Sequence, residues 1–573
     1  MLNIISTILN IAFFLITIQM ANAFTLQEFA TEKMLTVLLV KERAKCRKNN
    51  RSANRIAKDK KHNRNHKKIH LDRDCDINTL TRRKMLSRMM PPRHTWVRPS
   101  KRKKLPNKAV DTSKNTEKAL LLTIERDREL CKTTGKQFAY LQDLDKFIQQ
   151  IKKRLDDGHI QFERPLLVPI LKDKTTGNDG VTCVTCRPLA VYTQLEDKII
   201  ISVTSRYLTR LLDQHLHENI LSYRPPRHFH GQEHYVTTNN DGIALIKDFR
   251  DKHVDKDIYV ADCDIKKFYD SIPHSVVIEC FDRILDKTKL TSDGKAQVMS
   301  VLKAYLDSYN FYTNALIESQ VAPRQCFHKV RRRMKDQNDE NNYRIEWVDE
   351  IMALPEEEKA RRGVPQGGAL SLVIANVVLN DVDQFFVANK DDNRLFIRYC
   401  DDMILMHTSR EECERLMNAY TTSLTNHGLF YHDFEHVSQL KEQELTTKSF
   451  WKAKSHHTFK WDYGSGESNS YIGFLGYEMR RDGKMRLRKS KVKHFKEKLN
   501  RIYYAIRRYQ KSKKHSEKEK EQYRQKTLDQ LLDGVNFYKS LDLDTFKQGR
   551  QYKFFTKLRH RVEARLERLS PPS

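Results

Sequence analysis

A turn between two apolar runs carries two adjacent carboxylates, and it constrains this chain more than any other feature. Residues 399–402, Tyr-Cys-Asp-Asp, stand between the apolar runs 395–397 and 403–406. Two short apolar runs joined by polar residues predict a β-hairpin. A turn relaxes the alternation of side chains, so we expect Asp401 to reach a cavity while Asp402 supports it from behind. Asp-Asp turns are also common on protein surfaces, so this turn alone leaves both interpretations open.

A second carboxylate lies far upstream in a similar setting. The strand-like run 258–263 leads into Asp264, and the aromatic Tyr269 follows five residues later. Two divalent ions about 4 Å apart can activate a hydroxyl and steady a leaving group, but they need carboxylates from separate strands. Asp264 together with Asp401 meets that need.

Two glycine-containing segments complete the pattern. Residues 363–371, Gly-Val-Pro-Gln-Gly-Gly-Ala-Leu-Ser, predict a tight turn before an apolar helix over 372–383. A backbone without Cβ atoms can approach a nucleic acid base closely. Residues 470–479 predict a short hairpin downstream.

These segments resemble the palm motifs of reverse transcriptases, most like those of group II introns, retrons and related bacterial lineages. The resemblance covers roughly residues 165–538: segments 165–172 and 187–199 resemble the fingers, and segments 489–499 and 531–538 resemble the helical thumb. Two residues depart from the family pattern: Leu372 stands where Pro is usual, and Cys400 where Ala is commonest. The template-facing surface is therefore expected to differ.

The resemblance implies an α+β fold, a right-hand polymerase with fingers, a palm of antiparallel sheet plus helices, and a helical thumb, preceded by a basic, α-helical or disordered N-terminal extension. The expected divisions are a hydrophobic segment at 1–40, a basic RNA-binding extension at 41–111, N-terminal helices and fingers at 112–256, a palm at 257–480 with an insertion at about 285–360, and a basic helical thumb at 481–573. Two helices are expected over 119–156, with a start at 112–113 and a stop at Gly158.

The resemblance also assigns roles to individual residues. Asp264, Asp401 and Asp402 would bind two Mg²⁺ ions, with the Ile265 carbonyl as a backbone ligand and Mn²⁺ as the other candidate ion. The remaining assignments are a nucleotide-binding group and a primer and template group: Lys172, Arg187, Tyr269 and Gln366 for the nucleotide, and Pro365, Gly367, Leu475 and Gly476 for the primer and template. Tyr269 would act as a steric gate against the ribose 2′-hydroxyl, or alternatively as a core aromatic residue.

The charge of the chain predicts a polyanionic partner. The formal net charge is +31 over 573 residues, and nucleic acid is the natural candidate. Residues 41–104 hold 24 Lys or Arg against 5 Asp or Glu, about three fifths of the excess. This segment is expected to bind RNA, although a solvated tail is the alternative.

The ten cysteines form no disulfide framework, and free thiols in a reducing cytosol are the simpler account. Only Cys183 and Cys186 are closely spaced, which leaves zinc there as a weak alternative. Cys263 and Cys400 are expected to be small buried fillers. The apolar run 4–18 is short for a membrane span and lacks a preceding positive charge, although its extension to Ala23 approaches the roughly 20 residues that a span requires. We expect a cytoplasmic protein, with a membrane anchor through 4–23 as the minority interpretation.

The biological role follows by resemblance only. A reverse transcriptase with a basic extension and no expected nuclease most resembles the bacterial antiphage defence lineages, which work with a dedicated noncoding RNA. Expected partners are that RNA as template, the DNA product, deoxynucleoside triphosphates, and a second copy of the chain or a second protein of a defence operon. The alternatives are an intron maturase or retron enzyme and, from another class, a non-catalytic RNA-binding scaffold. Intact carboxylates argue against the scaffold, because clustered like charges serve no purpose without metal.

Overall fold

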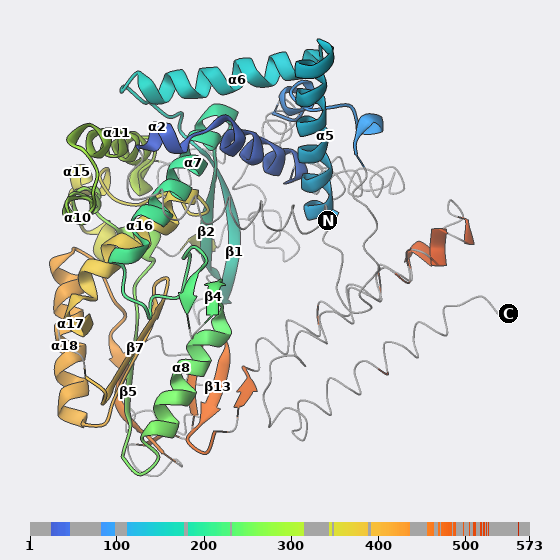
Figure 1. Ribbon diagram of the computed structural model, residues 1–573. Coiled ribbons are helices and arrows are strands. Elements are labelled where there is room, and N and C mark those ends of the chain that lie inside the picture. Colours follow the sequence, from blue (N-terminus) through green and yellow to red (C-terminus); the bar gives the residue numbers. More distant parts are fainter. Residues whose placement is uncertain are drawn as a thin grey trace.

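The computed structural model shows an α+β molecule built around one antiparallel sheet (Figure 1). It describes residues 25–45, 82–97, 112–176, 182–229, 232–313, 343–345, 349–387, 391–435, 455–462, 468–469, 471–483 and 485–488, and isolated positions from 497 to 560. The expected mixture of helices and antiparallel sheet is confirmed. The thumb segments 489–499 and 531–538 lie outside the described residues, apart from position 497.

The central sheet has the strand order β11-β10-β5-β8-β7, with β9 beside β10. Neighbours β10, β5, β8 and β7 are antiparallel, whereas the short strands β9 and β11 run parallel to β10. The strand bounds are β5 Tyr259–Asp264, β7 Arg394–Tyr399, β8 Asp402–His407, β9 Phe434–Glu435, β10 Ser455–Trp461 and β11 Ser468–Asn469. The hairpin expected over 395–406 is the β7–β8 pair.

Both faces of this sheet are covered, which explains why its strands are apolar at consecutive positions. Ala261 and Leu405 belong to the large core with helices α10, α16 and α18, whereas Val260 and Ile404 belong to a second core with α8 and the strands β12 and β13. Figure 1 shows α18 and α8 on opposite sides of the sheet. The helix bounds here are α8 Asn239–Lys252, α9 Phe268–Ser271, α10 His274–Asp286, α16 Ala369–Val382, α17 Gln384–Val387 and α18 Arg410–Asn426.

The predicted downstream hairpin is also present. Strands β12 (Tyr471–Phe474) and β13 (Tyr477–Arg480) pair antiparallel, and β14 (Met485–Leu487) extends them. The helix expected after the glycine-rich turn is α16, which begins three residues earlier than predicted and is buried along most of its length.

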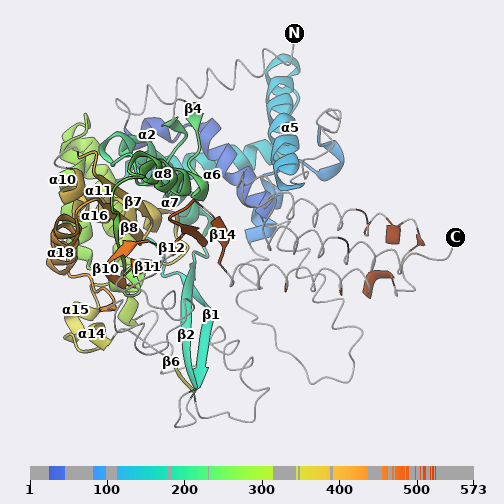
Figure 2. The same ribbon diagram turned by 90° about the horizontal axis from the view of Figure 1, so that it is seen from below.

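A second sheet contains a long two-stranded ribbon that projects from the rest of the molecule (Figure 2). Strand β1 (Leu166–Thr176) pairs antiparallel with β2 (Thr182–Val191), and β6 (Tyr343–Ile345) joins β2 in parallel. Helix α7 (Leu195–Leu211) follows β2 and packs against α16. The small hairpin of β3 (Arg227–Phe229) and β4 (Gln232–Tyr235) comes next.

The N-terminal part contributes to the main core more than the sequence suggested. Apolar side chains from three N-terminal segments lie in the large core. They come from helix α2 (Leu26–Phe29), from the helical residues 32–45, and from the helical residues 82–88 with the turn that follows them: Leu26, Phe29, Leu35, Leu39, Leu86, Met89 and Met90. The two predicted helices are confirmed as α5 (Thr112–Thr134) and α6 (Ala139–Asp156), and Gly158 has a φ of +68° after the second. Residues 46–81 of the basic extension lie outside the described residues.

The range assigned to an insertion, 285–360, contains structured core elements. Helix α11 (Ser292–Asp307) packs against α10 and α7 and buries Val298 and Leu302. The short helices α14 (Asp349–Met352) and α15 (Glu356–Lys359) precede the glycine-rich turn. The charged run 329–336 lies outside the described residues.

Of the helices described, none combines the length and apolar character that a bilayer crossing needs. The apolar run 4–23 lies outside the described residues.

Candidate active site

Three aspartates meet at one end of the central sheet. Asp264 is the last residue of β5, and Asp402, the first residue of β8, lies directly across from it in the register. Opposed side chains of an antiparallel pair project from the same face, about 5 Å apart at Cβ. Asp401 occupies the two-residue turn between β7 and β8. Asp402 is therefore a direct neighbour of Asp264 and not merely a support behind Asp401.

The turn that carries Asp401 is held from two sides. Cys400 has a left-handed backbone, with a φ of +59°, and its N–H donates to the Ser222 hydroxyl at 2.8 Å. Its carbonyl accepts from the Arg398 guanidinium at 3.1 Å. Arg398 is fully buried and pairs with the equally buried Asp383, 2.5 Å from Nε to Oδ2. Sequence reasoning missed this pair, although a charge inside the apolar run 395–399 is the signal that could have found it.

Backbone strain is concentrated around the same turn. Among the described residues, the non-glycine positions with left-handed backbones are Tyr223, Lys267, Cys400 and Leu475. Cys400 adjoins Asp401, Lys267 lies three residues after Asp264, and Tyr223 follows the serine that holds Cys400. A left-handed residue costs about 1–2 kcal/mol, and such residues cluster at functional sites.

The electrostatics favour a cation at this end of the sheet. Desolvation, followed by the carboxylates of Asp262, Asp264 and Asp401, raises the pKa of Asp402 to about 7. Asp402 is exposed, and solvent weakens the effect of desolvation. Repulsion among the carboxylates is therefore the main cause of the raised pKa. Hard divalent cations bind carboxylate oxygens, and this donor set fits Mg²⁺.

The neighbouring cysteines do not act as nucleophiles. Cys263 is buried between the aspartates of β5, and burial raises the pKa of its thiol. Burial also raises the pKa of the half-buried Cys400. A raised pKa keeps each thiol protonated, so both cysteines fit the filler role that the sequence suggested.

Tyr269 lies beside the turn that carries Asp401. It belongs to the short helix α9, is half-buried, and packs edge-on against Phe268 at 5.3 Å between ring centroids. Burial, and then the nearby groups Cys400, Asp401 and Tyr223, raise the pKa of Tyr269, while Arg187 acts in the opposite direction. The structure thus brings Tyr269 close to both the Asp401 turn and Arg187 of β2.

Gln366 connects the long ribbon to the palm. Its carbonyl accepts from the Ala190 N–H at 2.8 Å, and its side-chain amide donates to Asp270 at 2.9 Å. Asp270 is 1% exposed, and burial raises its pKa to about 6. Sequence reasoning missed Asp270, because only the fold shows that it orients the Gln366 amide.

The glycine-rich turn is crowded at one position. A Cβ on Gly368 would lie 1.9 Å from the Tyr305 hydroxyl, which bonds the Ser371 hydroxyl at 2.8 Å. The Ser371 hydroxyl in turn donates to the Pro365 carbonyl at 2.6 Å. Gly367 has a φ of +86° and is exposed, so its backbone is open to a ligand. Leu372, the departure from the family pattern, is half-buried in α16.

The remaining predicted residues occupy three places. Arg187 is exposed on β2, and Lys172 lies at the bulge of β1, where only its backbone is described. Ile265 is buried and bridges to Tyr431. Leu475 and Gly476 form the tip of the β12–β13 hairpin, where Leu475 is buried in the second core.

Asp262 is a further acidic residue that the sequence analysis left out. It lies two residues before Asp264 on the same strand, hence on the same face, and it hydrogen-bonds the Nδ1 atom of the buried His456. The alternation Asp-Cys-Asp at 262–264 was the available signal. His456 thus holds this acid at the base of the aspartate group.

A comparison with protein-family models gives the class of the central domain. Residues 172–434 match the family model described as "Reverse transcriptase (RNA-dependent DNA polymerase)". This range contains every predicted site residue except Leu475 and Gly476. No curated protein matches the chain in sequence.

Solved structures of telomerase are among those similar to the chain. The telomerase of Candida albicans, solved with the TWJ fragment of telomeric RNA, is 11% identical with a TM-score of 0.34, over 81% of this chain and 71% of that one. The apo telomerase of Candida tropicalis is 13% identical with a TM-score of 0.36, over 71% of this chain and 63% of that one.

Enzymes with such a domain use divalent metal ions. The family match covers strands β5, β7 and β8, the glycine-rich turn and the aspartates described above. Residues 172–434 therefore form a reverse transcriptase domain, and the protein is an RNA-directed DNA polymerase, a nucleotidyltransferase.

Proposed function

We propose that Asp264, Asp401 and Asp402 hold two Mg²⁺ ions for DNA synthesis on an RNA template, with the Ile265 carbonyl as a further ligand and Mn²⁺ as the alternative ion. The observation that carries this proposal is the position of Asp402 directly across from Asp264, beside the turn with Asp401. Among the described residues, the one group of three His, Cys, Asp or Glu side chains whose ligand atoms all lie within 4.8 Å of one another does not include these aspartates. The aspartates are therefore more widely spaced. A more open set of aspartates suits two ions better than one.

Bound there, the ions would activate the primer 3′-hydroxyl and neutralise charge on the triphosphate. The protein's own residues position the reactants. Tyr269, beside the catalytic turn, excludes a ribose 2′-hydroxyl by steric contact. Gln366, held by Asp270, presents an oriented amide to the nucleotide or the template base.

The phosphate and primer contacts come from the surrounding elements. Arg187 is exposed near Tyr269 and, with Lys172 on the facing strand, binds the triphosphate, because guanidinium and ammonium groups match phosphate oxygens. The exposed Gly367 lines the template side, and the buried Pro365 shapes its turn by accepting from the Gly368 N–H at 3.1 Å. The hairpin tip at Leu475 and Gly476 places the primer end.

The decisive experiment replaces one metal ligand. Asp401→Asn should lower Mg²⁺-dependent incorporation of labelled deoxynucleotide by at least about 10³-fold, because removing a charge-stabilising ligand costs several kcal/mol in the transition state. RNA affinity should stay within about twofold, because this carboxylate offers no attraction to phosphate. Asp392→Asn, on the exposed loop before β7, is the matched control and should be fully active. Wild-type synthesis by Asp401→Asn would refute the metal assignment.

We infer that the template is a dedicated noncoding RNA and that the enzyme works in bacterial antiphage defence. The support is the charge of +31 and the resemblance of the motifs to the defence lineages. A group II intron maturase or a retron reverse transcriptase remains the alternative enzyme, and a scaffold with a polymerase fold the alternative of another class. We place the enzyme in the cytoplasm, where RNA and deoxynucleotides are available, and a second copy or an operon partner would complete the assembly.

Sequencing the RNA and DNA that copurify with the chain separates these roles. The defence assignment would be supported by one recurrent RNA whose complementary DNA disappears in Asp401→Asn. Protection of cells against phage should then require both that RNA and the DNA. Intron RNA would favour the maturase. RNA without any complementary DNA would favour the scaffold.

A further inference from the structure

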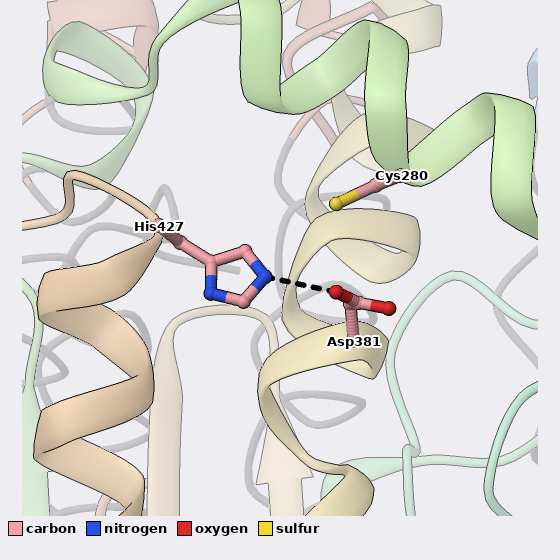
Figure 3. A group of neighbouring side chains, drawn as sticks. All are labelled: Cys280, Asp381 and His427. Carbon is pink, nitrogen blue, oxygen red and sulfur yellow. Dashed lines mark hydrogen bonds and ion pairs between the residues drawn. The ribbon is translucent and has the colours of Figure 1, made fainter.

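A second cluster of ligand-type side chains lies among the helices behind the sheet. Cys280 of α10, Asp381 in the last turn of α16 and His427, the C-cap of α18, converge in Figure 3. Their ligand atoms all lie within 4.8 Å of one another. None of these residues belongs to the aspartate site or was singled out by the sequence.

We propose that this cluster is a zinc site, in which one ion would bind side chains from α10, α16 and α18. The three side chains offer a thiolate, an imidazole nitrogen and a carboxylate oxygen, which is a ligand set that Zn²⁺ accepts with a water molecule in the fourth position. Mg²⁺ avoids sulfur and imidazole ligands. The site would therefore distinguish zinc from the ions of the polymerase centre.

The imidazole of His427 is already oriented to bind a metal ion. The Nδ1 atom of His427 lies 2.7 Å from the Ser423 carbonyl, and its Nε2 atom lies 2.9 Å from Asp381. A metal-binding histidine characteristically donates its other ring N–H to a carbonyl or carboxylate. With Nδ1–H committed to the Ser423 carbonyl, Nε2 is the atom that would bind the ion, and zinc would displace the proton that Nε2 donates to Asp381 in the metal-free state.

The helix termini also favour positive charge at this point. Asp381 lies in the last turn of α16, and His427 follows the last residue of α18. The C-terminal end of a helix carries partial negative charge, which disfavours a carboxylate and favours a cation. Two such ends meet beside the buried Cys280.

The spacing requires only a small adjustment. A tetrahedral zinc ion places nitrogen, oxygen and sulfur ligands about 3.3–3.6 Å apart. The separation of Nε2 and Oδ2 is 2.9 Å, so these two atoms must move apart by about 0.5 Å to admit the ion. Asp381 lies near a helix end and is only half-buried, so its side chain has room for this rotation.

Arg283 is the competitor for the same position. Its Nη2 atom lies 2.8 Å from Asp381 and 3.4 Å from the Cys280 sulfur. The same contacts make a metal-free network of ion pairs, in which Asp381 and Cys280 raise the pKa of His427 to about 10. The Arg283 side chain is 51% exposed and has Glu279 at 3.9 Å as a second partner, so it can withdraw when zinc enters.

The test measures zinc bound to the full-length protein. Protein stripped with a chelator and incubated with ZnCl₂ should retain one equivalent that millimolar Mg²⁺ does not displace. Cys280→Ser and His427→Gln should each lose at least nine tenths of that equivalent. Co²⁺ bound in its place should give a sulfur-to-cobalt charge-transfer absorption that Cys280→Ser abolishes.

Matched variants separate this site from the other cysteines. Cys131→Ser, a half-buried thiol on α5, and the double variant Cys183→Ser with Cys186→Ser should both keep the equivalent. Arg283→Gln should bind zinc at least tenfold more tightly, because the competing cation is gone. Equal zinc retention by wild type and Cys280→Ser, or its loss only in the Cys183 and Cys186 variant, would overturn the proposal and leave an ion-pair network. Equal thermal melting of the metal-free variants checks that each one is folded.

Discussion

The Tyr269 ring lies near the Asp401 turn and Arg187, and in the proposed function it would meet the sugar of an incoming nucleotide. Tyr269→Val should raise incorporation of ribonucleotide relative to deoxynucleotide by about 10–100-fold, the range that a steric change in a pocket produces. Tyr269→Phe keeps the ring and should discriminate as wild type does. Competition between the two nucleotides on a primed RNA template measures the ratio. Unchanged discrimination in the valine variant would show that the ring is only a core residue.

Asp270 is a buried carboxylic acid whose ionisation affects the stability of the fold. Burial raises its pKa from 3.8 to about 6, so its charged form destabilises the folded state. That cost is complete above pH 6 and disappears as the pH falls towards 3.8. Asp270→Asn, which keeps an oxygen for the Gln366 amide, should therefore be more stable than wild type at pH 8 by about 1–3 kcal/mol.

Urea denaturation of both proteins across pH 8, 6 and 4 measures this difference. The advantage of Asp270→Asn should shrink below pH 6 and vanish near pH 4. A variant that is less stable than wild type at pH 8 would mean that the ionised carboxylate is stabilised by its surroundings.

At the scale of elements, the buried Arg398–Asp383 pair connects strand β7 to the end of α16 and supports the turn that carries Asp401. Arg398→Met should lower the free energy of unfolding by about 3–5 kcal/mol, because Asp383 is left buried without its partner. The double variant Arg398→Met with Asp383→Leu should recover most of that stability. The double variant still lacks the hydrogen bond from residue 398 to the Cys400 carbonyl. Its rate of DNA synthesis should therefore remain below that of wild type.

Chemical denaturation and single-turnover kinetics on the same preparations test both statements. An equal decrease of stability in the single and double variants would show that the pair is not the cause. Wild-type synthesis by the double variant would show that the turn does not depend on Arg398.

At the scale of the whole molecule, parts of the basic extension belong to the folded core. Its flanking parts, 41–45 and 82–97, are structured, and Leu86, Met89 and Met90 lie in the large core. Arg82 also bonds the Thr193 carbonyl at 3.0 Å. Deletion of 41–104 would therefore remove core residues and damage the polymerase itself.

The informative variant changes only residues 46–81, which hold 11 Lys or Arg against 4 Asp. Replacing those 11 with Gln should weaken binding of the copurifying RNA. The slope of log K against log salt should become shallower by about 0.7 for each single-strand phosphate that is no longer neutralised, or about 0.9 for each duplex phosphate. Extension of a short generic primer should survive. Identical slopes would show a solvated tail, and failure of generic extension would show a role in the polymerase core.

The local pattern of the sequence determined the elements that carry the aspartates. Alternating and continuous apolar runs, a polar turn at 400–401 and a glycine-rich break at 363–368 are short-range signals, so β5, the β7–β8 hairpin, α16 and the β12–β13 hairpin were all predictable. Resemblance to a family then supplied roles for individual residues, which neither periodicity nor composition could assign.

The tertiary structure decided which distant residues meet. The opposition of Asp264 and Asp402, the bond from Gln366 to Asp270, the Arg398–Asp383 pair and the cluster of Cys280, Asp381 and His427 each join residues from separate elements. Such contacts depend on strand register and helix packing, which are set by burial across the whole core and leave no periodic signal in the chain. The same reason explains why the N-terminal helices, which resemble a separate extension in sequence, are part of the main core in the folded protein.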